Sequence, residues 1–113
     1  MKQFLSSKIH KAIITEADLN YIGSITIDRE LMELTELEEG QKVLVVDNTN
    51  GARLETYVIP GIQGQICMNW AAAHLMNVGD EIIIMGFALS DTPLTPKSIL
   101  VNEKNEFVEN LQK

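Results

Sequence analysis

The sequence predicts a mainly β fold: many short strands forming a small barrel, with a few short helices. Short runs rich in Val, Ile, Leu and Thr alternate with clusters of Gly, Asn, Asp and Pro, which is typical of strands joined by turns. Asn50-Gly51 separates two such runs, and Asn-Gly is the strongest short-range indication of a hairpin. We find no solenoid repeat, linker or low-complexity tract, so we expect a single domain over residues 1–113.

Each element is predicted from its own local pattern. Asp28 is a suitable N-cap for a short helix over residues 29–34, since its carboxylate can accept the free N–H groups of the first turn. A second, brief helix is expected over residues 71–75, where alanines are concentrated. The strands are expected at residues 8–15, 21–27, 42–47, 54–59, 65–68 and 81–89, with a last hairpin of 98–101 and 106–108.

Composition excludes several classes of partner. The formal charge is −7, from nine Lys and Arg against sixteen Asp and Glu, whereas nucleic-acid backbones are bound through dense Lys and Arg surfaces. Cys67 is the only cysteine, so no internal disulfide can form, as is usual in a reducing cytosol. We see neither a signal peptide nor an apolar stretch long enough for a membrane span. The expectation is a cytoplasmic protein that binds neither nucleic acid nor membrane.

The familiar catalytic and metal-binding motifs are also missing from the sequence. His10 and His74 lie far apart, and neither has the HExxH or CxxC spacing typical of a metal site, so no metal is expected. Cys67 reads as a small buried apolar residue rather than a nucleophile. Because GxSxG, P-loop and Rossmann patterns do not occur, hydrolase and nucleotide-binding functions have no support.

The Gly23-Ser24 pair can carry a specific chemistry, although Gly-Ser is common in loops. Gly23 has no Cβ, so its carbonyl can be strained and approached by the Ser24 hydroxyl. Attack there moves the acyl group from nitrogen to oxygen and gives an ester. Elimination and hydrolysis at Ser24 then leave an N-terminal pyruvoyl group, a ketone electrophile made without a bound cofactor.

Several motifs, in order along the chain, resemble the aspartate 1-decarboxylase family. They are KIHK at 8–11, ADLNYIGS at 17–24, TNGAR at 49–53, ETY at 55–57, Asn69 with AAA at 71–73, and VGD at 78–80. The resemblance implies a double-psi β-barrel, a homotetramer with sites at subunit interfaces, and a maturation factor in some members. It also implies self-cleavage between Gly23 and Ser24 into a β chain, 1–23, and an α chain, 24–113. The reaction implied is pyruvoyl-dependent conversion of L-aspartate to β-alanine and CO₂ for pantothenate and coenzyme A.

The same resemblance implies a role for each matching residue. Ser24 becomes the pyruvoyl group, Thr56 assists self-processing and contacts substrate, and Tyr57 donates a proton. Lys8 and Arg53 meet the substrate carboxylates, while His10 and Tyr21 lie near the site. The substrate loop is Asn69, Trp70, Ala71 and Ala72.

These residue types suit the chemistry. An imine between the substrate amine and the ketone draws electrons from the breaking Cα–CO₂ bond, as a cofactor electron sink does. The planar guanidinium of Arg53 can orient a carboxylate, and the Tyr57 hydroxyl can return a proton to the carbanion. Taken without the resemblance, Arg53 reads as a solvated charge beside a turn, and Tyr57 as a packing residue of a strand.

The sequence departs from the family pattern at three places. Trp70 stands where glycine is usual, so we expect that this position does not require a positive φ. Val46 stands where some members carry a tryptophan, and the loop 60–65 is shorter than in some relatives. An indole is therefore lost at one place near the site and gained at another.

Two alternatives to aspartate decarboxylation stay open at this point. A non-catalytic β-barrel module that never matures is favoured by Trp70 and disfavoured by the intact set of Gly23, Ser24, Thr56 and Tyr57. A pyruvoyl decarboxylase for a different acidic amino acid, such as glutamate, is also conceivable, although a bulky Trp70 argues against a longer substrate.

Overall fold

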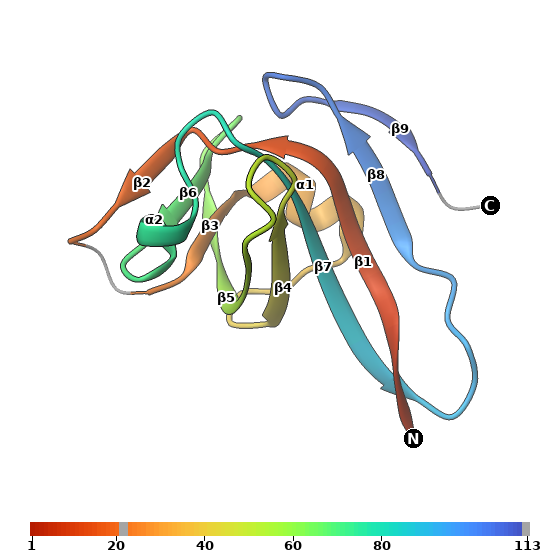
Figure 1. Cartoon of the computed structure of the whole chain (residues 1–113). Coiled ribbons are helices and arrows are strands. Elements are labelled where there is room, and N and C mark those ends of the chain that lie inside the picture. Colours follow the sequence, from red (N-terminus) through yellow and green to blue (C-terminus); the bar gives the residue numbers. More distant parts are fainter. Residues whose placement is uncertain (21–22, 112–113) are drawn as a thin grey trace.

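Two long antiparallel strands, β1 and β7, run side by side through a nine-stranded sheet (Figure 1). The computed structural model describes residues 1–20 and 23–111 of the chain. Over these residues the strand order is β2-β6-β3-β5-β4-β7-β1-β8-β9. The elements are β1 (Lys2–Ile13), β2 (Glu16–Asp18), β3 (Ile25–Asp28), α1 (Arg29–Thr35), β4 (Lys42–Asp47), β5 (Arg53–Gly61), β6 (Ile66–Asn69), α2 (Ala72–Leu75), β7 (Glu81–Ser90), β8 (Lys97–Val101) and β9 (Phe107–Asn110).

The sheet mixes parallel and antiparallel pairs and curls back on itself. β1 pairs in parallel with β8, β2 with β6, and β3 with β5, so segments far apart in the sequence lie together. Just beyond β1, the Thr15 backbone N–H donates to the carbonyl of Ile66 in β6 at 2.8 Å. Thr15 lies between β1 and β2, so this bond extends the β2–β6 pair and brings the end of β1 to a strand far from it in the strand order. The mainly β, barrel-like fold with short helices is therefore confirmed.

Most predicted strands agree with the structure to within a few residues. The first strand, expected over 8–15, begins earlier, because pairing of β1 with β7 already starts at Lys2, opposite Ser90. The Asn-Gly hairpin forms as expected, with Gly51 at φ +79° and Val46 opposite Arg53 across the β4–β5 pair. The strand expected over 21–27 is shorter, because ladder pairing of β3 begins only at Ile25; Tyr21 and Ile22 lie outside the described residues. The short, exposed β2 was not predicted, and it exists because it pairs with β6.

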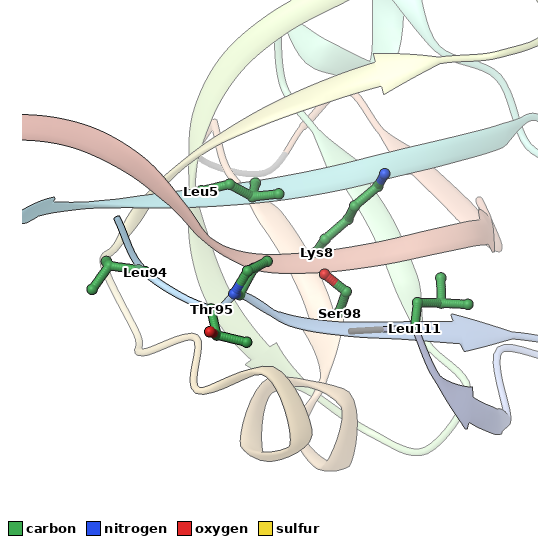
Figure 2. Close-up of a pocket in the computed structure, with 7 residues that line it drawn as sticks. Leu5, Lys8, Leu94, Thr95, Ser98 and Leu111 are labelled. Carbon is green, nitrogen blue, oxygen red and sulfur yellow. The ribbon is translucent and has the colours of Figure 1, made fainter. Parts of the chain in front are cut away.

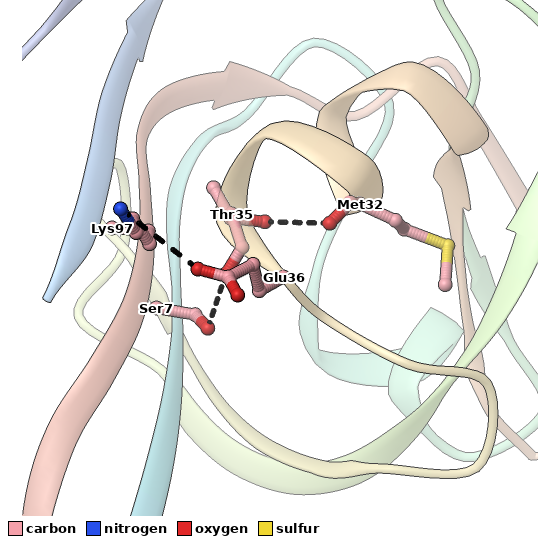
Figure 3. A network of polar contacts seen from close by, with 5 residues as sticks. All are labelled: Ser7, Met32, Thr35, Glu36 and Lys97. Atoms are coloured by element: carbon pink, nitrogen blue, oxygen red, sulfur yellow. Dashed lines mark hydrogen bonds and ion pairs between the residues drawn. The ribbon is translucent and has the colours of Figure 1, made fainter.

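Helix α1 begins at the predicted cap and is anchored at its far end. Asp28 Oδ1 accepts the N–H of Glu30 at 2.8 Å. At the other end, Ser7 of β1 donates to the carbonyl of Thr35 at 2.6 Å, and Glu36 lies 4.0 Å from Lys97 of β8 (Figure 3). No helix in the described part of the chain is long and apolar enough to cross a membrane.

Isoleucine dominates the core that holds these elements together. The side chains that fill it come from β1, from each strand from β3 to β8, and from both helices, so one apolar cluster joins these elements. The fully buried isoleucines are Ile9, Ile14, Ile25, Ile27, Ile66, Ile82, Ile84 and Ile99. β-Branched side chains pack well on a pleated surface and lose little rotamer freedom there, which explains why strands outnumber helices.

Two buried carboxyl groups, Asp47 and Asp80, meet at the end of the β4–β5 hairpin. Asp47 Oδ1 accepts the backbone N–H groups of Thr49 and Asn50, and Asp80 Oδ2 accepts that of Asn77. Burial, and then the hydrogen bond to Asp80, raise the pKa of Asp47, whereas the same hydrogen bond lowers the pKa of Asp80. Asp47 Oδ2 accepts no hydrogen bond from the described residues, so a proton that stays on Asp47 and is shared with Asp80 in a hydrogen bond satisfies both groups.

Replacing Asp47 by asparagine tests this shared proton. Because the pKa of Asp47 is raised by folding, its stabilising effect is present at low pH and lost as the pH rises through the folded-state value. Asparagine keeps an acceptor for Thr49 and a donor for Asp80 without titrating. We expect Asp47→Asn to gain stability over the parent as the pH rises, reaching about 1 kcal/mol at pH 8, measured by urea unfolding between pH 5 and pH 8. Glu103→Gln, at an exposed site, is the control and should show no such trend.

Candidate functional site

A pocket of about 330 Å³ opens where β5, β6 and α2 meet beside Gly23. It brings together five of the residues that the sequence singled out: Gly23, Thr56 and Tyr57 with Ala71 and Ala72 of the turn into α2. Asn69, the last residue of β6, is a sixth such residue in the lining. The full lining is Gly23, Leu54, Glu55, Thr56, Tyr57, Asn69, Ala71, Ala72 and Leu75.

Ser24 is buried beside this pocket and bonded to Asn69 through both backbone and side chain. Its relative exposure is 1%. The backbone N–H of Asn69 donates to the Ser24 carbonyl at 3.0 Å, which extends the β3–β6 pairing by one bond beyond the strand. The Asn69 amide Nδ2 donates to Ser24 Oγ at 2.8 Å. The serine oxygen is therefore held in a fixed place next to the Gly23 peptide.

Two residues that the sequence analysis did not select complete this buried polar cluster. Thr26 Oγ1 accepts a second bond from Asn69 Nδ2 at 3.1 Å, and the Cys67 thiol lies 3.2 Å from Asn69 Oδ1. Thr26 could have been found, since residues two apart on a strand point to one face and it follows Ser24 at that spacing. Cys67 could have been found in the same way, since it lies two residues before Asn69 on β6.

The backbone at Trp70 contradicts the expectation drawn from its side chain. Trp70 has φ 55°, the left-handed region that glycine occupies without steric cost. The conformation is imposed by its neighbours: its N–H donates to the carbonyl of Asp18 at 2.7 Å, and its carbonyl accepts the N–H of Ala73 at 3.0 Å. The chain thus turns from β6 into α2 over two residues, Trp70 and Ala71.

The Trp70 side chain lies over Gly23 and is otherwise open to solvent. A Cβ placed on Gly23 would lie 3.6 Å from Trp70 Cβ and 3.9 Å from Cδ1, while 57% of Trp70 is exposed. The indole therefore lies at the surface beside Gly23; Trp70 is part neither of the core nor of the pocket lining.

The strand and hairpin around the pocket fix Thr56 and Tyr57. Both lie in β5, where Thr56 is opposite Val43 and Tyr57 is opposite Lys42 of β4. Tyr57 is 37% exposed at the pocket wall, so its hydroxyl is accessible to a ligand. Asn50 of the hairpin donates from Nδ2 to the carbonyl of Leu75 at 2.9 Å, which ties the β4–β5 hairpin to α2.

Lys8 lies in a different pocket, away from Ser24. Together with Leu5 it belongs to β1, and the rest of this pocket, of about 400 Å³, comes from β8 and the segments next to it (Figure 2). His10 follows two residues later on β1. Burial, and then the charges of Lys8 and Lys11, lower the pKa of His10.

Arg53 is at the exposed start of β5 and is not among the residues that line the Gly23 pocket. Among the described residues, the pocket lining contains neither Lys nor Arg. Val46, where some relatives carry tryptophan, pairs directly with Arg53. Tyr21 lies outside the described residues. Within the described residues, we also find no group of three or more His, Cys, Asp or Glu side chains that could hold a metal.

The positive φ at Trp70 predicts which of two substitutions at this position gives the more stable protein. We expect Trp70→Gly to be more stable than Trp70→Ala by about 1 kcal/mol, since both variants lose the indole but only alanine keeps a Cβ in the left-handed region. Urea unfolding at pH 7 measures the difference. At the exposed helical position Glu33 of α1 the same pair of substitutions should give the opposite order, alanine above glycine. Alanine above glycine at position 70 would contradict the left-handed backbone.

Comparison with known proteins agrees with the motifs that carried the resemblance. The family model described as aspartate decarboxylase matches residues 1–108. A protein of Clostridium botulinum named aspartate 1-decarboxylase is 52% identical over 111 residues, covering 93% of this chain and 90% of its own length. Proteins with the same name from Acetivibrio thermocellus and Desulfitobacterium hafniense are 50% and 49% identical, covering 92% and 96% of this chain and 87% and 90% of theirs. The chain therefore belongs to the aspartate decarboxylase family, a family of carboxy-lyases.

Proposed function

We propose that the protein decarboxylates L-aspartate to β-alanine and CO₂, using a pyruvoyl group made from its own Ser24. The observation that carries the proposal is the buried bond from Asn69 Nδ2 to Ser24 Oγ, beside Gly23 and a pocket that also presents Thr56 and Tyr57. β-Alanine made in this way would serve pantothenate and coenzyme A synthesis. We place the enzyme in the cytoplasm, where a free thiol such as Cys67 stays reduced.

Maturation begins at the Gly23–Ser24 peptide. Ser24 Oγ forms a bond to the Gly23 carbonyl carbon while the bond from that carbon to the Ser24 nitrogen breaks, and the hydroxyl proton passes to the nitrogen. The ester then loses the Ser24 Cα proton and the Cβ–Oγ bond, which releases the carboxylate of Gly23. Water then adds to the carbon that carries the Ser24 nitrogen, and this nitrogen leaves as ammonia. Two chains result, 1–23 and 24–113.

The residues around Ser24 fit the pyruvoyl group that these steps would leave. The two N–H groups of the Asn69 amide point at Ser24 and Thr26, so Asn69 can donate to an oxygen at this position. The site is buried from water, where such a hydrogen bond is strong. When present, the pyruvoyl ketone supplies an electron sink for breaking the bond to CO₂.

The remaining pocket residues would orient the substrate and move one proton. Thr56, next to Gly23 in the pocket, is placed to assist self-processing and to contact the substrate. The Tyr57 hydroxyl would supply the proton that takes the place of CO₂ on the substrate carbon. Asn69 with Trp70, Ala71 and Ala72 would form the loop over the substrate, its backbone already held by Asp18.

We further propose that the site is completed between subunits of a homotetramer. L-Aspartate carries two carboxylates, and Arg and Lys are the side chains that bind carboxylates most strongly. The Gly23 pocket lacks both in its lining, whereas Lys8 faces another pocket and Arg53 is exposed. A neighbouring copy would therefore bring Lys8, with His10 beside it, and Arg53 to the pocket of Ser24.

Intact-mass analysis of the purified protein tests self-processing. We expect two chains, with the 24–113 chain lighter by one ammonia than a chain that begins with serine. Ser24→Ala should stay as one chain and be inactive, because it lacks the attacking oxygen. Ser7→Ala also removes a buried serine hydroxyl, but Ser7 lies on β1 and does not line the pocket, so this variant should still be cut.

The other outcomes have definite meanings. A cleaved, active Ser24→Ala protein would refute the origin of the electrophile. A parent chain that stays uncut after prolonged warming, alone or with lysate of its source cells to supply a maturation factor, would favour the non-processing module. Product analysis with aspartate and with glutamate separates the two substrates, and β-alanine from aspartate is the expected product.

Mixing two inactive variants tests the shared site. Lys8→Ala and Ser24→Ala are each expected to be strongly impaired alone, since each lacks one half of every site. If the halves come from different subunits, tetramers assembled at random from both should recover about a quarter of the parent activity, because a quarter of the sites combine an intact Ser24 with an intact Lys8. Native mass spectrometry verifies mixing. No recovery in verified mixed tetramers would place both residues in one subunit.

A further inference from the structure

The thiol of Cys67 lies at one end of a buried hydrogen-bond chain that leads to Ser24. Cys67 Sγ is 3.2 Å from Asn69 Oδ1, and Asn69 Nδ2 reaches Ser24 Oγ at 2.8 Å and Thr26 Oγ1 at 3.1 Å. All four residues are at most 8% exposed. Each polar atom of the Asn69 side chain therefore has a partner within the protein.

An asparagine amide can occupy such a place in two orientations, with its oxygen and nitrogen exchanged. In this structure the Asn69 nitrogen, with its two N–H groups, faces the two hydroxyl oxygens, and the Asn69 oxygen faces the thiol. The thiol supports this orientation by donating to the oxygen, whereas sulfur is only a weak acceptor for the N–H groups of a reversed amide. Burial, and then the negative charges of Glu16 and Asp18, raise the pKa of Cys67, so the sulfur keeps its proton and can donate it to an oxygen.

We propose that Cys67 is a positioning residue for self-processing, whose S–H group holds the Asn69 oxygen and thereby points the Asn69 amide nitrogen at Ser24. The inference rests on the proposed cleavage at Ser24 and adds a residue to it. Cys67 does not touch the reacting atoms and acts only through Asn69.

The chemistry of the first step explains why the orientation matters. Before the step Ser24 Oγ carries a proton; afterwards it is an ester oxygen, joined to the Gly23 carbon, and can only accept. An amide N–H that faces it keeps its hydrogen bond in both states. A reversed amide would present an oxygen to the ester oxygen, which leaves two acceptors in contact in a buried place. The orientation held by Cys67 therefore favours formation of the ester.

Substitutions at Cys67 should change the rate of cleavage. We expect Cys67→Ala, which has no donor, to be cut roughly five- to tenfold more slowly than the parent, the change expected for loss of one hydrogen bond. Cys67→Ser restores a donor and should be cut within about twofold of the parent rate. The measurement is intact mass against time for the full chain made by cell-free synthesis.

A neighbouring residue provides the matched control. Ile66→Val removes one buried heavy atom from the same strand, as Cys67→Ala does, but leaves the polar cluster intact. We expect it to lower the unfolding free energy without slowing cleavage. Equal slowing in Ile66→Val and Cys67→Ala, or no rescue by serine, would show that only packing matters and would overturn the proposal.

A second measurement does not depend on cleavage. In the parent, NMR should show cross-relaxation between the Asn69 side-chain NH₂ protons and the Thr26 methyl group, and Cys67→Ala should weaken it as the amide populates both orientations. If the parent chain is never cut, the proposed function fails but this comparison still tests Cys67. Unchanged cross-relaxation and an unchanged cleavage rate in Cys67→Ala would each contradict the positioning role.

Discussion

The site depends on one constraint: Asn69, at the end of β6, holds the segment that leads into β3. Its backbone N–H donates to the Ser24 carbonyl, and its side-chain Nδ2 donates to the Ser24 hydroxyl. One residue therefore restrains both the backbone and the side chain of the serine. Ile25, the next residue, is fully buried and pairs with Val58 and Met68 on its two sides. Ser24 is thus fixed by a paired strand on one side and by Asn69 across from it.

The same constraint explains the unusual backbone that follows Asn69. Because β6 must end at Asn69 to reach Ser24, and α2 must begin at Ala72 to close the pocket, the chain has to turn at Trp70. The bond from Trp70 to Asp18 offsets the cost of a positive φ on a residue with a bulky side chain. Pairing of β2 with β6 supplies that partner, so the short β2, with no apolar residue buried, has a clear structural role.

The described lining of the pocket lacks the cationic side chains that a dicarboxylate substrate needs. This described lining offers a hydroxyl, a phenol and an amide, and the one charged residue in it is Glu55, which lies 2.6 Å from Lys42 in an exposed ion pair. Such a surface binds a dicarboxylate poorly by itself. Exposed Arg53 and the separate pocket of Lys8 are on surfaces that a neighbouring copy could bring to it, which links the proposed assembly to the proposed chemistry.

Local patterns in the sequence were enough to predict the β class, the Asp28 cap and the Asn50-Gly51 hairpin, because each depends on residues a few positions apart. The family motifs also selected Gly23, Thr56, Tyr57 and Asn69, which the structure brings to one pocket. Only the tertiary structure decided that β3 begins after Ser24, that Trp70 takes a positive φ, and that Ser24 and Thr26 hydrogen-bond to Asn69. These features arise where β3 and β6, some forty residues apart, hydrogen-bond to each other. Pairing between strands so far apart in the sequence is set by packing and register, and neither composition nor local spacing predicts it.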